Sequence, residues 1–211
     1  MKIRIFSDYV WPFCWIGKGL VEEFKETFSI EDKWIPFELQ PGTPAEGRLL
    51  TDKFQPHEIT SMFDHLRQRG TRYGMVFNDR DRSSNSHMAL VAGEFAQDAG
   101  LFEPFHKKLF KAFFTDLQDI GQLDTLLEIA TDSGLNPEEL TKALASDRYE
   151  DRLSVAATEA KRLGIRSIPA FVFADDEIIS GAQSPEFFRD ALQNIKQGTY
   201  RKPLFWEDAI L

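Results

Sequence analysis

The chain has 211 residues, of which 42% are hydrophobic and 28% are charged, and its formal net charge is −9. This size and composition are typical of one soluble globular domain, or of one domain that carries an insertion. The negative charge argues against a nucleic-acid partner, because such binding depends on a cationic surface that neutralises phosphates.

The N-terminal segment and the cysteine content indicate a cytoplasmic protein. Residues 1–8 alternate charged and bulky side chains, so they lack the uninterrupted apolar region of a secretory signal. No run is long and apolar enough to span a bilayer, and we therefore expect no membrane partner. Cys14 is the single cysteine, which fits a reducing compartment.

The first forty residues predict a strand, a helix and a second strand. Lys2 to Ser7 has the pattern of a short buried strand. A helix is expected to begin at Pro12, since proline is favoured at the first helical position. Lys33 to Gln40 alternates as a strand does, and Pro36 inside it lacks a ladder donor, which predicts a position at the sheet edge.

The middle of the chain predicts helices. Residues 40–47 have turn chemistry, and from Thr51 to Leu144 the periodicity indicates helices throughout. Apolar stripes or caps mark four of them, at residues 88–99, 102–113, 123–131 and 137–145.

The last part predicts a helix over 148–163, a hairpin of strands at 170–174 and 177–180, and a helix from the cap Ser184 to Gln197. The order β-α-β... α-β-β-α indicates an α/β, thioredoxin-like fold with a helical insertion domain. We expect its first part at 1–50, the insertion at 51–145, its second part at 146–200 and a C-terminal tail at 201–211. The tail is apolar at 202–206, which suits docking on the domain or on a second subunit in a homodimer.

The segment Trp11-Pro12-Phe13-Cys14-Trp15 lies where the first strand gives way to the helix. A Cys-x-x-Cys pair at a helix start works because the helix N-terminus lowers the pKa of the first thiol and the second resolves the mixed disulfide. Here Trp11 takes the first position and Cys14 the second. No intramolecular disulfide can form, so dithiol-disulfide exchange is not expected.

Several segments together resemble one family. Residues 6–18, FSDYVWPFCWIGK, resemble the active-site helix start of DsbA-like thioredoxin-fold proteins of the FrnE-like group, where a Cys-Pro-Trp-Cys-type motif is usual. Residues 164–172, GIRSIPAFV, resemble the cis-proline loop of that family, and 179–183, 85–90 and 37–41 are similar to further landmarks. The resemblance implies the same fold over nearly the whole chain.

The reactive position departs from the family pattern. The first cysteine of the motif matches Trp11, and an indole cannot attack a disulfide. The segment also resembles the corresponding one of kappa-class glutathione transferases and 2-hydroxychromene-2-carboxylate isomerases, which have Ser-Pro-Tyr-Ser in the same place. In those proteins the first serine is assigned the activation of glutathione. Trp11 cannot take that role either, but Trp11 and Cys14 occupy the two positions of the catalytic pair and are the predicted catalytic-site residues.

Two interpretations of Cys14 stay open. The first helical turn favours a thiolate, so Cys14 could act as a catalytic residue that forms a mixed disulfide with glutathione or a partner. Aromatic neighbours disfavour the charged form, and the alternative is a buried, inert thiol inherited from the resolving position.

The resemblance also implies a binding groove. Pro169, preceded by Ile168, would be a cis-proline whose neighbouring backbone pairs with an extended peptide or with glutathione; the alternative is an ordinary proline before an edge strand. Trp11, Pro12 and Phe13 would line the groove, with Trp11 the most exposed of the aromatic residues and Trp15 buried.

Asn85 and His87 would approach the catalytic end of the first helix, or else cap the helix that follows them. The arginines at 67, 69, 72, 80 and 82 could receive a ligand carboxylate, although interleaved aspartates favour a solvated charged face. The four histidines lack ligand-type spacing, so no metal is expected.

Two functional hypotheses follow. The first is a thiol- or glutathione-linked enzyme, an isomerase, a transferase or a single-thiol catalyst, with no covalently bound cofactor and glutathione as the candidate cofactor. The second is a non-catalytic module that binds a peptide or a protein partner in the same groove. Either way the expected ligand is a small-molecule thiol or a peptide.

Overall fold

Strand β1 (Lys2–Ser7) lies inside a four-stranded sheet of order β2-β1-β5-β6. It pairs in parallel with β2 (Glu31–Pro36) and antiparallel with β5 (Ala170–Val172), which pairs antiparallel with β6 (Ile178–Ser180). The structure is a computed structural model and describes residues 1–201. It confirms the predicted β1 at both ends.

Strand β2 is an edge strand, as Pro36 predicts, but its predicted bounds are wrong. It begins at Glu31 and ends at Pro36, which lies opposite Ser7. The next backbone N–H, of Phe37, still donates to the Ser7 carbonyl at 3.0 Å. The N–H of Leu39 then donates at 2.8 Å to the side chain of Asp8 instead of to a strand, so the ladder stops there.

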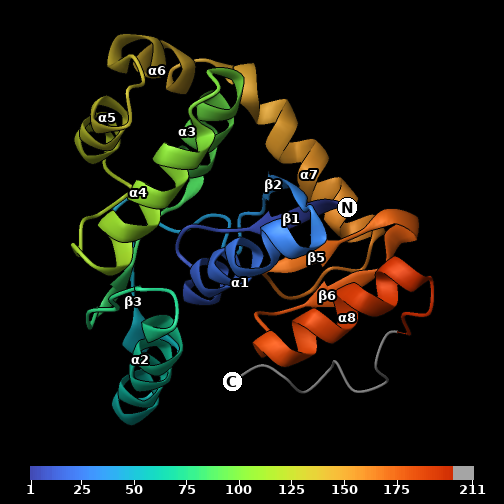
Figure 1. Cartoon of the computed structure of the whole chain (residues 1–211). Coiled ribbons are helices and arrows are strands. Elements are labelled where there is room, and N and C mark those ends of the chain that lie inside the picture. Colours follow the sequence, from blue (N-terminus) through green and yellow to red (C-terminus); the bar gives the residue numbers. More distant parts are fainter. Residues whose placement is uncertain (202–211) are drawn as a thin grey trace.

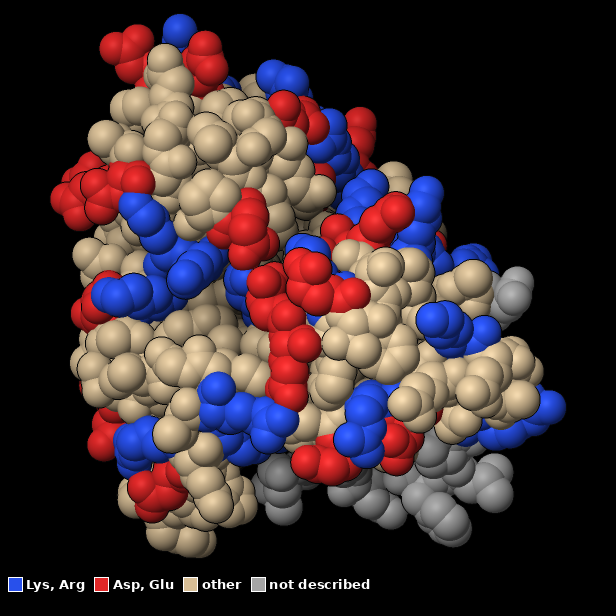
Figure 2. All heavy atoms as spheres, viewed as in Figure 1, with Lys and Arg blue, Asp and Glu red and all other residues tan. Residues whose placement is uncertain are grey.

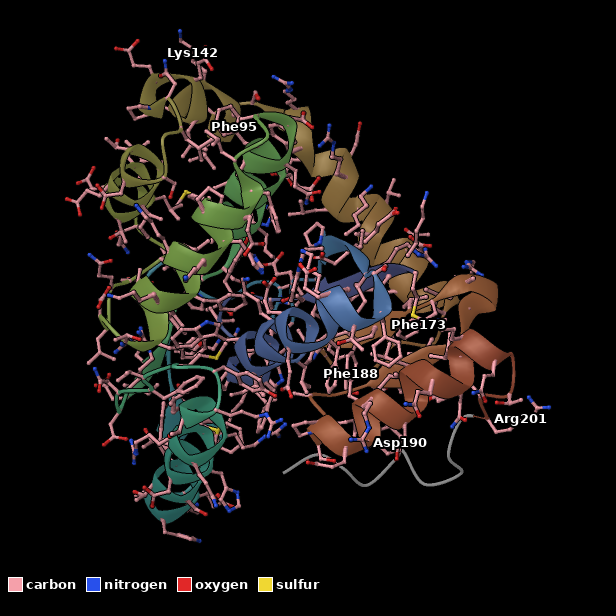
Figure 3. All side chains as sticks on the ribbon, in the orientation of Figure 1. Phe95, Lys142, Phe173, Phe188, Asp190 and Arg201 are labelled. Atoms are coloured by element: carbon pink, nitrogen blue, oxygen red, sulfur yellow. The ribbon has the colours of Figure 1, made fainter. Side chains whose placement is uncertain are left out.

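Helices α1 (Pro12–Phe28) and α8 (Pro185–Gln197) lie next to each other in front of the sheet (Figure 1). The ring of Phe171 on β5 lies 4.9 Å from that of Phe188 on α8, measured between centroids. Figure 3 shows Phe188 pointing from α8 toward the interior and Asp190 on the outer side of the helix. Aromatic packing therefore fixes α8 on the sheet.

The predicted helices between α1 and β5 are confirmed with small shifts at their ends, and Asn136 and Ser184 cap α6 and α8 as expected. The helices of this part are α2 (Pro56–Thr71), α3 (His87–Asp98), α4 (Phe102–Phe114), α5 (Leu123–Asp132), α6 (Pro137–Leu144) and α7 (Glu150–Arg162). The single 3₁₀ turns are η1 (Leu50–Asp52), η2 (Asp147–Tyr149) and η3 (Ala174–Asp176).

The prediction that residues 51–144 are helical throughout is wrong at one place. Strand β4 (Arg82–Ser83) pairs antiparallel with β3 (Arg48–Leu49), and no helix covers the residues between α2 and α3. A two-residue strand leaves too short an alternation to be detected by periodicity. Nothing in the local pattern separates it from the neighbouring charged turns.

The element order confirms the α/β, thioredoxin-like fold, with α2 to α6 between β2 and α7. Trp15 of α1 joins the two parts, because its ring packs on Phe77, Phe110 and Phe114 at centroid distances of 4.8 to 6.3 Å. The predicted division at 50 and 145 stays a prediction. The predicted apolar tail at 202–206 lies outside the described residues.

Charged side chains gather in two places on the face that Figure 2 shows. Figure 2 shows acidic side chains running down the middle of the view over α1 and cationic side chains gathering over α4 and α2 to its left. Within residues 1–201 no helix is long and apolar enough to cross a membrane.

Candidate functional site

The turn between β1 and α1 holds the motif singled out from the sequence. Trp11 has an extended backbone and occupies the N-cap position, and its N–H donates to the Asp8 carbonyl at 3.3 Å. Pro12 follows as the first helical residue and is buried. The Cys14 N–H donates to the Trp11 carbonyl at 2.9 Å, which places Cys14 in the first helical turn, as expected.

The predicted burial of Trp15 is confirmed, while the prediction that Trp11 is the most exposed of the three aromatic residues of the motif stays a prediction. Trp15 is buried against Phe110 and Phe114 of α4, whereas Trp11 and Phe13 are half-buried. The rings of Trp11 and Phe13 lie 5.7 Å apart between centroids. They form a partly exposed apolar pair at the start of α1.

The Cys14 thiol has no exposed surface. Burial raises the pKa of Cys14 to about 12, hydrogen bonds with the Ser7 hydroxyl and the Asp8 backbone lower it only in part, and the Asp8 charge raises it further. Such a thiol is neutral at physiological pH, and an inaccessible neutral thiol is a poor nucleophile. This geometry favours the inert alternative, while the catalytic roles of Cys14 and Trp11 stay predictions.

The Ile168–Pro169 peptide bond is cis, in agreement with the expectation. Pro169 lies against α1: a Cβ added at Gly17 would come within 2.8 Å of its Cγ. The Pro169 carbonyl accepts a hydrogen bond from the Gly181 N–H at 2.7 Å. Within residues 1–201 neither the N–H nor the carbonyl of Ile168 has a hydrogen-bond partner.

Arg69 of α2 connects the motif to the hairpin exit. Its guanidinium lies 5.7 Å from the centre of the Phe13 ring, and its Nη2 donates to the carbonyls of Ala182 and Gln183. Burial lowers the pKa of Arg69. No carboxylate within the described residues pairs with it, so a half-buried cation stands beside the aromatic pair without a counter-charge.

The expectation of a solvated arginine face is therefore wrong for Arg69, and also for Arg80. The Arg80 guanidinium lies over the Phe113 ring at 3.6 Å and donates to the Phe113 carbonyl. Burial lowers the pKa of Arg80 to about 10. Arg67 and Arg72 do pair with exposed carboxylates.

Asp8 is fully buried directly before the motif. One of its oxygens accepts from the Leu39 N–H at 2.8 Å and the Ser86 hydroxyl at 3.1 Å, and the other from the Val10 N–H at 3.3 Å. Burial raises the pKa of Asp8 to about 6, because the three hydrogen bonds offset only part of the desolvation. This acid changes charge close to neutral pH.

The segment 85–87 lies at the start of α3, and the roles predicted for Asn85 and His87 in ligand binding stay predictions. Asn85 accepts from the His87 N–H at 2.9 Å near the start of α3 and donates to the Thr43 carbonyl at 2.5 Å. Ser86 at the same time joins the segment to Asp8, which lies directly before α1.

The His87 ring lies between two carboxylates, with Nδ1 at 3.1 Å from Glu38 and Nε2 at 3.0 Å from Glu150. Burial disfavours the imidazolium, but these two hydrogen bonds outweigh it and the pKa of His87 is raised. We call Asp8, Ser86, His87, Glu38 and Glu150 the polar cluster.

Sequence reasoning missed Asp8, Ser86, Glu38 and Glu150, and it named Arg69 only within a stretch of arginines for which it favoured a solvated face. A signal existed for three of them: Asp8 ends a buried strand, Ser86 lies between Asn85 and His87, and Glu38 lies in a segment noted for its resemblance. Glu150 and Arg69 lie on helices that are far in the sequence from the residues they contact, and no local pattern predicts these contacts. The described residues contain no group of three His, Cys, Asp or Glu side chains able to hold a metal.

The sheet order, the helix that begins after β1 and the proline loop facing it define a thioredoxin-fold protein. Residues 2–193 match the model of the DSBA-like thioredoxin domain. The chain belongs to this family of DsbA-like thioredoxin-fold oxidoreductases.

Similar proteins agree with this assignment. The uncharacterized protein YwbO of Bacillus subtilis is 28% identical over 92% of this chain and 96% of its own length. A probable DsbA oxidoreductase from Streptomyces coelicolor has a TM-score of 0.85 and 27% identity over 99% of this chain and 94% of its own. Cytosolic disulfide reductase DsbM from Pseudomonas aeruginosa, solved with GSH, has a TM-score of 0.68 and 17% identity over 93% of this chain and all of its own, which shows the fold alone.

Proposed function

We propose that the chain is an FrnE-like member of the family that has lost the dithiol pair and works as a cytoplasmic, glutathione-linked isomerase or transferase. The observation that carries this proposal is the Ile168 backbone, which has no partner within the described residues and lies next to Pro169 against α1. Glutathione is an extended peptide whose main-chain groups can pair with such a backbone.

The surroundings of the loop suit the rest of the ligand. Arg69 offers a cation without a counter-charge for a carboxylate. The half-buried pair Trp11 and Phe13 offers an apolar surface for a small substrate. DsbM has been solved with GSH, which adds support from a protein of the same fold.

In this proposal the external thiol replaces the missing cysteine. The N-terminus of α1 favours a thiolate near it, so the bound thiol loses its proton to solvent. Its sulfur then adds to an electrophilic carbon of a conjugated carbonyl substrate: the carbon–sulfur bond forms, the carbon–carbon π bond breaks and its electron pair moves onto the carbonyl oxygen. In a transfer this adduct takes up a proton from solvent and leaves as the product. In an isomerisation the same bond breaks again after rearrangement and glutathione is released unchanged. Cys14 stays a buried packing residue throughout.

Calorimetric titration with reduced glutathione tests the proposal. The wild-type protein is expected to bind saturably at or below millimolar concentration, and Pro169→Ala, which removes the contact with α1, to bind at least about tenfold more weakly. Pro137→Ala at the start of α6 is the matched control and is expected to bind as the wild type does. Absence of wild-type binding at millimolar glutathione would contradict the proposal.

A non-catalytic binding module is the second candidate, because Cys14 is inaccessible and the chain has no other thiol. A thiol-free peptide, acetyl-Ala-Val-Ala-amide, separates the two. Binding of this peptide together with no binding of glutathione would favour the module.

A further inference from the structure

A cleft of about 540 Å³ lies between the loop that follows β2 and strand β4, and it is independent of the glutathione proposal. Its half-buried lining residues are Gln40, Arg48, Leu50, Phe54, Arg82 and Ser83. The charged residues Glu46, Asp52 and Lys53 are exposed and form its rim. A volume of this size is typical of a small-molecule site.

The backbone holds the cleft in shape. Arg48 lies opposite Ser83 and Leu49 opposite Arg82, and the Leu50 N–H donates to the Asp81 carbonyl at 2.7 Å. Gly47 has a φ of 75°, and a Cβ there would collide with the Ser83 carbonyl. Only glycine allows the loop to approach β4 this closely.

Two arginines in this lining are held in place but keep most of their donors. Arg48 donates through Nη2 to the Gly42 carbonyl at 3.2 Å, and Arg82 through Nη1 to the Glu46 carbonyl at 2.9 Å. These are the side-chain hydrogen bonds that the two guanidiniums make within residues 1–201, and a guanidinium has five N–H donors. Each fork is thus oriented by one nitrogen and can still bind a ligand with the others.

The charge of the cleft is not neutralised from within. Neither Arg48 nor Arg82 forms an ion pair with a carboxylate of the described residues, and the nearest acids in the lining, Glu46 and Asp52, are exposed at the rim. Both guanidiniums are open to solvent, so a ligand anion can reach them. Carboxylate and phosphate groups match the planar, bidentate geometry of arginine.

We propose that this cleft binds a small organic anion, with its carboxylate or phosphate head on Arg48 and Arg82 and its apolar body on Leu50 and Phe54. Ser83 and Gln40 supply further hydrogen-bonding groups to the head. The cleft is a site separate from the Pro169 loop, although residues close to its lining reach Asp8: the Leu39 N–H before Gln40 and the Ser86 hydroxyl, three residues after Ser83, both donate to its carboxyl group.

Phenyl phosphate and benzoate are suitable probes, with benzyl alcohol as the uncharged control. Amide chemical shifts of Gln40 and Ser83 are expected to move saturably with at least one of the two anions and not with benzyl alcohol. Tighter binding of phenyl phosphate would assign a phosphate head, and tighter binding of benzoate a carboxylate head.

The double variant Arg48→Gln, Arg82→Gln is expected to weaken binding of the preferred anion at least about tenfold. Arg189→Gln, on the exposed side of α8, is the matched control and is expected to bind as the wild type does. Equal affinity in the folded double variant, or no saturable shift at Gln40 and Ser83 of the wild type with either anion, would overturn the proposal. The wild-type shifts decide the matter even if the double variant does not fold.

Discussion

The Cys14 thiol and the Asp8 carboxyl group lie on the two sides of the turn that joins β1 to α1, yet they differ in how they titrate near neutral pH. The pKa of Cys14 rises from 9.0 to about 12 despite hydrogen bonds with the Ser7 hydroxyl and the Asp8 backbone. The pKa of Asp8 rises from 3.8 to about 6, although its carboxyl group accepts three hydrogen bonds. Both are fully buried. Burial raises both pKa values, and hydrogen bonds offset only part of the increase at either group. Because an ordinary carboxyl group titrates far below an ordinary thiol, the same effect brings Asp8 close to neutral pH and takes Cys14 far above it.

The largest expected effect concerns Cys14. A shift of the thiol pKa from 9.0 to about 12 lowers the thiolate population by about 10³-fold near neutral pH. Iodoacetamide should therefore label Cys14 at least about 10³-fold more slowly in the native protein than in guanidinium, with free glutathione as the control for solvent effects. Comparable labelling rates in the native and unfolded protein would contradict the claim that the Cys14 thiol is inaccessible and neutral.

The pH dependence of stability tests the Asp8 side of the comparison. Its folded pKa, about 6, exceeds the ordinary 3.8, so the folded state binds the extra proton between these values. The stability gained by this proton is full below pH 3.8 and is lost as pH rises through 6, by about 3 kcal/mol.

Asp8→Asn removes this titration. Relative to the wild type, the variant should gain about 2 kcal/mol between pH 4 and pH 6.5 in urea unfolding, because part of the total change lies outside this range. Asp190→Asn on the outside of α8 is the matched control. A constant difference between wild type and Asp8→Asn over this range would mean that Asp8 is not poised near neutral pH.

Gly17→Ala tests the contact between α1 and the Pro169 loop. Alanine favours a helix over glycine by about 1 kcal/mol, but its methyl would lie 2.8 Å from Pro169 Cγ and 3.1 Å from the Phe171 ring. Overpacking of this kind costs about 1 to 3 kcal/mol, so we expect a net loss of about 1 kcal/mol in chemical denaturation. A net gain would show that the loop is free to move away from α1.

The smallest expected effect concerns His87. Its pKa is raised by two carboxylates, so its contribution to stability is full below pH 6.5 and is lost as pH rises through the folded pKa. Because the side chain is 37% exposed, we expect His87→Gln to lose about 1 kcal/mol or less at pH 5.5 and less still at pH 9. His65→Gln, exposed on α2, is the control; a loss that grows with pH would contradict the account.

Local patterns predicted much of the fold. Strand β1, the start of α1 at Pro12 and the caps Asn136 and Ser184 depend on neighbouring residues, and the structure confirms them. The end of β2 could not be predicted, because it depends on the Leu39 N–H finding the Asp8 carboxylate.

The candidate site was predicted only in part for the same reason. The motif at 11–15 and the loop at 168–169 are contiguous and were found from the sequence. The contacts of Arg69 with Gln183 and of His87 with Glu150 join residues 114 and 63 positions apart. Only the packing of the helices against the sheet brings such side chains together.

The central claim is that this site holds and activates an external thiol. Cys14→Ala leaves no cysteine in the chain, so thiolate absorbance at 240 nm then reports glutathione alone. Titrated over pH 6 to 9 at saturating glutathione, the variant should show a glutathione thiol pKa below that of the free tripeptide, because the α1 N-terminus favours the thiolate. A bound thiol that titrates at or above the free value would contradict the account.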